Sequence, residues 1–199
     1  VGASGFAGGF TCYVPGVQAD DFRTVNAAKL IPANSDIAFA VHYTPTGTEV
    51  IDRPLIGFTV ADKPAEKQWI GYAISGASAD FAIPPQDPNY QSPPADVEFG
   101  ADVWLVQMMP HMHLRGKDMT YHLIYPDGRD EIILNVPKYD FNWQITYELA
   151  KPKLLPAGTK VEVIAHYDNS ANNKFNPDPS KDVRWGDQTW EEMMIGFFS

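Results

Sequence analysis

Short segments in which apolar and polar residues alternate run through the sequence, and they limit the possible folds more than any other feature. A period of two is that of a β-strand with one buried face. Eight such segments are rich in β-branched and aromatic residues and are bounded by Pro, Gly, Asn or Asp: 36–43, 54–60, 67–74, 102–108, 118–125, 131–136, 160–167 and 191–198. The best helix candidate, 21–30, is brief and runs directly into "IPANS". We therefore predict an all-β protein.

An internal repeat indicates how the strands are organised. The segments "IPANSDIAFAVHYTP" (31–45) and "LPAGTKVEVIAHYDN" (155–169) share a turn with Pro and Ala, an alternating strand and a terminal His-Tyr. Their offset, from His42 to His166, is 166 minus 42, or 124 residues. Self-similarity of this kind predicts two related antiparallel β-sandwich domains. Subtracting 124 from positions in the region 111–113 leads to positions before residue 1, so we expect the first domain to be incomplete in this chain.

Turn-forming residues mark the loops. The stretch "YPDGRDE" (125–131) places Pro-Asp-Gly between two alternating segments, which predicts a β-hairpin. Residues 81–100 contain five prolines and few apolar residues, which is the composition of an exposed linker. We place the domain boundary near residue 95, with the remainder of the first sandwich at 1–95 and a second sandwich at 96–199.

Composition excludes several classes of partner and site. The formal net charge is −10 and the isoelectric point is about 4.8, which opposes binding to nucleic acid. No apolar run approaches the roughly 20 residues of a membrane-spanning helix, so we expect no membrane insertion. Cys12 is the only cysteine, which excludes an intrachain disulfide and a multi-cysteine zinc site. A metal would have to use His, Met, Asp or Glu.

The segment "PHMHLRGK" (110–117) contains a candidate metal chelate. On a strand, His111 and His113 point to the same face about 7 Å apart, while Met112 faces the other way. Pro110 is compatible with this only near the edge or start of a strand. Imidazoles suit zinc, copper, iron or nickel, and a thioether ligand would favour Cu(I); the candidate third ligands are His166, Met193, Met194 or a carboxylate. The residues alone leave open a purely structural, hydrogen-bonded histidine pair.

Two motifs carry a resemblance to a known family. "HMHLRGK" (111–117), followed by "EEMMIGFF" (191–198), resembles the second copper domain of the copper type II, ascorbate-dependent monooxygenases, the family of peptidylglycine α-hydroxylating monooxygenase and dopamine β-monooxygenase. The resemblance implies that His111, His113 and Met193 hold a catalytic, oxygen-binding copper. It also implies two jelly-roll-like sandwiches with a solvent-filled cleft between two coppers.

The function that the resemblance implies is C–H hydroxylation of a small-molecule substrate. Dioxygen and a one-electron donor such as ascorbate would be consumed, in a secreted or periplasmic protein. The alternative is a non-catalytic copper-binding or structural β-sandwich module of a larger extracytoplasmic assembly.

The chain also departs from the family pattern. His42 in "FAVHYT" resembles the last ligand of the family's electron-transfer copper, but the adjacent His-His pair of that site is absent. His42 would therefore bind copper only with partners from upstream domains of a longer polypeptide, and its repeat equivalent His166 remains an extra candidate ligand. The residues that hold the peptide substrate in peptide-amidating members are replaced by Met109, Ile195 and Phe197. We therefore do not expect a peptidylglycine substrate.

Overall fold

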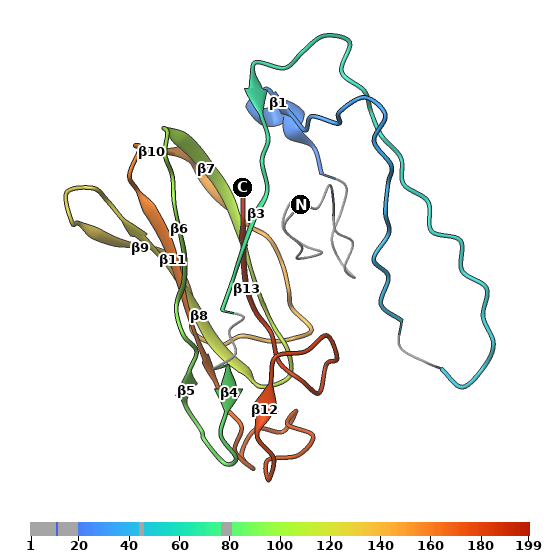
Figure 1. Ribbon diagram of the computed structural model, residues 1–199, viewed down its shortest axis with the longest axis vertical. Coiled ribbons are helices and arrows are strands. Elements are labelled where there is room, and N and C mark those ends of the chain that lie inside the picture. The colour runs from blue at the N-terminus through green and yellow to red at the C-terminus, as the bar shows by residue number, and fades with distance from the viewer. Residues whose placement is uncertain (1–10, 12–19, 44–45, 77–80) are drawn as a thin grey trace.

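The computed structural model describes residues 11, 20–43, 46–76 and 81–199, and within these residues the protein is all-β, as predicted. Two antiparallel sheets form a sandwich (Figure 1). The described residues contain no helix long and apolar enough to cross a membrane. Cys12 lies outside the described residues.

The first sheet carries the candidate ligands and is built from strands far apart in the sequence. Its order is β10-β7-β13-β3, with β10 at Tyr147–Leu155, β7 at Val103–Met112, β13 at Met194–Phe198 and β3 at Tyr72–Ser75. Both neighbours of β7 are antiparallel to it. The C-terminal strand β13 therefore lies between β7 and β3, inside the sheet.

The second sheet has the order β5-β11-β8-β9, and β6 also pairs with β11. The strands are β5 at Tyr90–Gln91, β11 at Lys160–Tyr167, β8 at Gly116–Ile124, β9 at Asp130–Val136 and β6 at Ala95–Glu98. The predicted hairpin joins β8 to β9, and Gly128 in its turn has a φ of 83°. A left-handed conformation of this kind favours glycine.

Two small strand pairs accompany the sandwich. The strands β1 (Ala27–Ala28) and β2 (Lys67–Gln68) pair in parallel, and β4 (Ala82–Ile83) pairs with β12 (Val183–Arg184). The predicted helix at 21–30 is instead a single 3-10 turn, η1 (Phe22–Val25). Asn26 ends it with a φ of 53°, because a left-handed residue cannot continue a right-handed helix.

The hydrophobic core lies between the two sheets. Along β11, Val161, Val163, Ala165 and Tyr167 are buried, while the residues between them face outward. The sheets approach closely at Gly196 of β13, where an added Cβ would lie 2.7 Å from a methyl group of Val163. Alternation along each strand therefore defines an inner core face and an outer face.

The Pro-rich stretch 81–100 is part of the sandwich and not an exposed linker. It contains β4, β5 and β6, and Phe81, Ile83 and Ala95 are buried. Its prolines lie between these short strands, where no ladder hydrogen bond is needed. Because β3 pairs with β13 and β5 with β11, the sandwich begins ahead of residue 95. No strand is assigned to the described residues between Ala28 and Lys67, including the alternating segments 36–43 and 54–60.

Candidate metal centre

The end of β7 presents His111 and His113 on the outer face of the first sheet. Met108 and Met112 point into the core, so the odd-numbered residues between and after them point outward. The two imidazole rings lie with their centroids 5.4 Å apart and their planes at 88°. His113 is buried and His111 is half-buried. The structure thus places the predicted pair side by side.

Pro110 lies where β7 has only one neighbouring strand. The pairing of β10 with β7 ends at Met108, whereas β13 pairs with β7 from Met108 to Met112. A residue without an N–H is tolerated there because no ladder bond on the β10 side is lost. The histidine pair therefore lies at the rim of the sheet, as the sequence indicates.

The register of β13 decides which methionine faces the histidines. Met194 pairs with Met112, and Ile195 pairs with His111. Directly opposed residues of antiparallel strands lie on the same face. Met194 therefore belongs to the core face. Met193 precedes the first residue of β13, and continued alternation would place it on the face of His111 and His113. Met193 is 3% exposed but does not belong to the main core cluster, whereas Met194 does.

A glutamine orients the His111 ring. Nδ1 of His111 lies 2.6 Å from Oε1 of Gln144, and the amide nitrogen of Gln144 donates to the carbonyl of Phe141 at 2.8 Å. Since the amide nitrogen is used in this way, Oε1 accepts the proton of Nδ1. The lone pair of the neutral ring is then at Nε2, the usual arrangement of a metal-binding histidine.

The His113 ring is held by the loop before β13 and by an aromatic side chain. Its Nδ1 lies 3.3 Å from the carbonyl oxygen of Glu191, and its ring meets Phe141 edge-on with centroids 6.1 Å apart. A hydrogen bond from Nδ1 to a carbonyl again favours the tautomer with its lone pair at Nε2. Phe141 thus lies beside His113 and also accepts the bond that orients Gln144.

Both imidazoles are neutral at pH 7. Burial lowers the pKa of His111 to about 4, against the opposing effect of the Gln144 hydrogen bond. Burial also lowers the pKa of His113, while the carbonyl groups of Glu191 and Gln188 act in the opposite direction. A neutral imidazole is the form that binds a metal, so no proton has to be displaced at neutral pH.

Glu192 is a buried carboxyl group that the motif analysis did not identify as functional. Its Oε2 accepts the backbone N–H of His113 at 2.9 Å, and its Oε1 accepts the backbone N–H of Arg115 at 2.6 Å. Burial raises the pKa of Glu192 to about 8, while these N–H donors, the N–H of Met193 and the charge of Arg115 oppose the increase. Glu192 therefore ties the segment after β7 to the residue that precedes Met193.

Two tyrosine hydroxyls fix the backbone next to the candidate ligands. The Tyr139 hydroxyl donates to the Met112 carbonyl at 2.6 Å and lies 3.0 Å from the Met112 N–H. The Tyr167 hydroxyl donates to the carbonyl of Met193 at 2.7 Å. No spacing rule connects these tyrosines to the histidines, so the sequence contained no signal for them.

The other candidate ligands do not join the pair. His166 lies on the outer face of the second sheet, where its Nδ1 is 2.6 Å from Asp118, and the outer faces of a sandwich point away from each other. His42 is exposed, in a segment without strand structure. The described contacts include no hydrogen bond from His42 to the pair, although a charge on His42 would contribute to the lowered pKa of His111. His42 therefore remains a candidate only together with partners outside the described residues.

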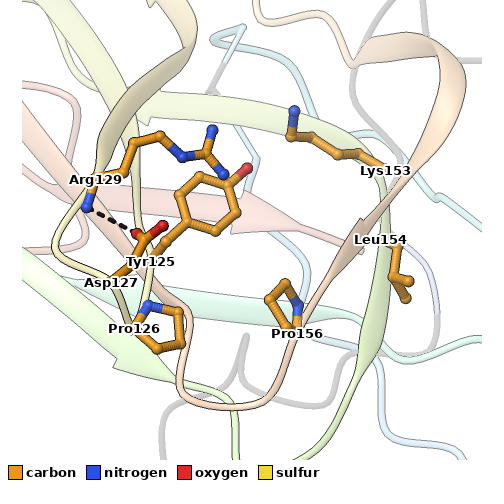
Figure 2. A pocket seen from close by; sticks show the side chains of 7 residues that line it. All are labelled: Tyr125, Pro126, Asp127, Arg129, Lys153, Leu154 and Pro156. Atoms are coloured by element: carbon orange, nitrogen blue, oxygen red, sulfur yellow. Dashed lines mark hydrogen bonds between the residues drawn. The ribbon is translucent and has the colours of Figure 1, made fainter.

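The described residues contain no group of three or more His, Cys, Asp or Glu side chains arranged to hold a metal. The donor set that the sequence predicts for the candidate centre is two imidazoles and one thioether. A separate surface groove of about 470 Å³ lies beside the β8–β9 turn (Figure 2). Its two basic side chains are already paired: Lys153 and Arg129 both contact Glu131, and Arg129 stacks on Tyr125 at 3.7 Å.

No protein family and no curated protein sequence matches this chain. Among solved structures, the chain is similar to the VP2 subviral particle of infectious bursal disease virus, with 12% identity and a TM-score of 0.31. That match covers 73% of this chain and 36% of the viral chain. The Gx strain of the same virus matches with 10% identity and a TM-score of 0.30, over 73% of this chain and 41% of the viral one. The chain thus spans well under half the length of these viral chains.

Proposed function

We propose that this protein binds copper through His111, His113 and Met193. The observation that carries the proposal is that two neutral imidazoles, each hydrogen-bonded at Nδ1, lie side by side at the end of β7. Alternation ahead of β13 supports Met193, which is buried, as the third ligand on the same face. Met194, its neighbour, is committed to the core on the opposite face. A soft thioether beside two imidazoles favours Cu(I) over zinc or other borderline metals.

The activity that we propose is hydroxylation of a substrate C–H bond with dioxygen and a one-electron donor such as ascorbate. The copper, when bound, would supply the one-electron chemistry that activates dioxygen. This step relies on the resemblance of "HMHLRGK" and "EEMM" to the copper type II monooxygenases. The same resemblance supports a jelly-roll-like topology, a small-molecule substrate and a secreted or periplasmic location.

The residues of this chain have separable roles in that proposal. Gln144 holds the tautomer of His111 that leaves Nε2 free to bind. Phe141 packs edge-on against His113 and limits the access of water to that ring. Glu192 holds the backbone of His113 at a fixed distance from the start of β13. All three act by positioning and need not contact substrate.

The rival proposal is a non-catalytic copper-binding module of a larger extracytoplasmic assembly. It is favoured by the absence of a second histidine cluster among the described residues, because the family's chemistry uses two coppers. Both proposals require copper at the same three residues, so copper binding is the first property to test.

The experiment is to measure copper content and Cu(I) affinity of the purified chain, His111→Ala and Met193→Leu. We expect one copper per chain, lost in His111→Ala and bound more weakly in Met193→Leu. His166→Ala is the matched control, since its ring is bonded to Asp118 on the far face and its loss should leave copper binding unchanged. Copper binding that is absent, or that neither substitution changes, would overturn the proposal. If copper binds as expected, an assay of turnover with ascorbate separates the enzyme from the non-catalytic module.

A further inference from the structure

A cavity of about 310 Å³ lies at the end of the sandwich where β7 begins. One wall is formed by the start of β7 and the end of β13, and the other by Val25, Ala27 and residues 67–70 of the β1–β2 region. Leu105 lines the cavity and is six positions from His111 in β7, which corresponds to about 20 Å along a strand. The cavity is therefore distinct from the candidate metal centre at the opposite end of β7.

A β-bulge in β7 shapes the sheet at this cavity. The backbone N–H groups of Val106 and Gln107 both donate to the carbonyl of Ser199, at 2.7 and 3.2 Å. Two residues of one strand thus oppose one residue of the other, which defines a bulge. Leu105 and Met108 are consequently both buried although an odd number of positions separates them. The bulge bends the strand, and residues 102–106 ahead of it line the cavity.

Aromatic side chains dominate the lining. Tyr72 stacks on Phe198 with ring centroids 5.3 Å apart and meets Phe99 edge-on at 5.4 Å. Phe198 and Phe99 are buried, so the core fixes the position of this group. The other aromatic lining residues are Trp69 and Trp104, and Trp104 is 50% exposed. Flat aromatic faces gathered in this way favour a planar ring as ligand.

The wall formed by the β1–β2 region is held in place by its own contacts. The ring of Trp69 packs on the ring of Phe22 with centroids 4.6 Å apart. The backbone N–H of Trp69 donates to the carbonyl of Ala28 at 2.9 Å, directly after the parallel pairing of β1 with β2. The cavity is thus formed before a ligand binds, which lowers the entropic cost of binding.

The charged groups of the lining favour an anion. The Lys67 ammonium group lies 5.5 Å from the centroid of the Trp104 ring, and Lys67 is exposed. The ion pairs among the described residues do not include Lys67. Asp102, the acidic residue of the lining, instead accepts the backbone N–H of Ala157 through Oδ1 at 2.9 Å. An anionic group on a ligand that stacks in the cavity would therefore meet Lys67.

We propose that this cavity binds a small aromatic molecule that carries a carboxylate. Its ring lies among the aromatic side chains, and its carboxylate pairs with Lys67 beside Trp104. A volume of about 310 Å³ is at the lower end of the range for ligand pockets, so the cavity is suited to one or two fused rings. This inference does not depend on copper.

The test is an NMR titration of the 199-residue chain with indole-3-acetate and two analogues. Indole-3-acetamide keeps the ring and lacks the charge, whereas cyclohexylacetate keeps the charge and lacks the aromatic face. We expect indole-3-acetate to bind with a Kd of roughly 0.1–1 mM. Each analogue should bind at least about threefold more weakly, because it loses either the ion pair or the aromatic stacking.

Two exposed residues of the lining provide the variants. Trp104→Ala should weaken the binding of indole-3-acetate at least about tenfold. Lys67→Met should weaken it about three- to tenfold and remove the preference for the acid over the amide. The matched controls are Trp143→Ala and Lys174→Met, which change exposed residues outside the lining and should leave binding unchanged. The melting temperatures of all four variants should stay within about 3 °C of the wild type.

Four outcomes would overturn the proposal. The first is the absence of binding at about 10 mM indole-3-acetate. The second is binding that Trp104→Ala and Lys67→Met change no more than their controls do, because the ligand would then lie elsewhere. The third is equal binding of the acid and the amide by the wild type, which would contradict the role of the charge. The fourth is equal binding of cyclohexylacetate, which would contradict the role of the aromatic faces.

Discussion

Met193 and Met194 are adjacent, chemically identical and both almost fully buried, yet they are expected to differ in role. The difference arises because adjacent residues of an extended chain point to opposite faces, and the register with β7 turns Met194 toward the core. Leu replaces Met with little change in volume and removes the sulfur, which makes the two positions a matched pair.

We predict that Met193→Leu weakens Cu(I) binding by at least about tenfold and changes the free energy of unfolding by less than about 1.5 kcal/mol. Met194→Leu should have a similarly small effect on unfolding and leave Cu(I) affinity unchanged. Competition with a Cu(I) chelator and chemical denaturation measure the two quantities. Equal affinities for the two variants would contradict the assignment of Met193.

Gln144 tests whether the orientation of His111 matters for binding. Gln144→Leu removes the acceptor at 2.6 Å from Nδ1, so the ring loses the bond that selects its tautomer. We predict roughly 10- to 100-fold weaker copper affinity. Gln91→Leu, on β5 of the other sheet and exposed, is the control and should bind as the wild type does. An unchanged affinity in Gln144→Leu would show that packing alone orients the ring.

At the scale of elements, one side chain connects the end of β7 to the start of β13. Glu192 is fully buried, and its carboxyl group accepts the N–H groups of His113 and Arg115, 79 and 77 residues away in the sequence. Arg115 in turn donates to Asn169 and to the carbonyl of Trp190, so the same connection orders the loop before Met193.

We predict that Glu192→Ala lowers the free energy of unfolding by about 2–4 kcal/mol, because two buried N–H groups lose their acceptor. The same variant should weaken copper binding, since His113 and Met193 are no longer held together. Glu148→Ala on the exposed edge of β10 is the control, with an expected change within about 0.5 kcal/mol. Urea titration provides the measurement, and equal stability of the two variants would contradict the role of Glu192.

The sequence predicted the elements unevenly. The strands at β7, β8, β9 and β11 were expected, as was the turn at Gly128, because alternation and turn chemistry are local properties. The strand β10 was missed: it is an edge strand with a register shift between Glu148 and Lys153 and a proline at 152. Edge strands tolerate such interruptions, but in the sequence alone the same features predict a loop.

At the scale of the whole molecule, the described residues before Tyr72 lie outside the two main sheets. Every strand of the two main sheets lies at or after Tyr72. The described residues from 20 to 68, including the β1–β2 pair, contribute no strand to these sheets. The candidate ligands His111, His113 and Met193 therefore belong entirely to the sandwich.

We predict that a fragment of residues 69–199 folds, melts within about 5 °C of the 199-residue chain and binds copper with the same affinity. A fragment of 81–199 lacks β3, which exposes the edge of β13, and should aggregate or unfold. Circular dichroism and size-exclusion chromatography distinguish the two fragments. An unfolded 69–199 fragment would show that the residues before 69 support the sandwich.

Local sequence was sufficient for the all-β class, for most of the long strands and for the shared face of His111 and His113, because side-chain alternation follows from backbone geometry alone. Alternation alone could not choose between Met193 and Met194, which only the resemblance distinguished, and it contained no signal for Gln144, Tyr139 and Glu192 as supports of the pair. Those assignments depend on the register of β13 against β7 and on contacts between residues 27 to 79 positions apart. Register is decided by which faces are buried when the strands pack, and only the tertiary structure contains that information.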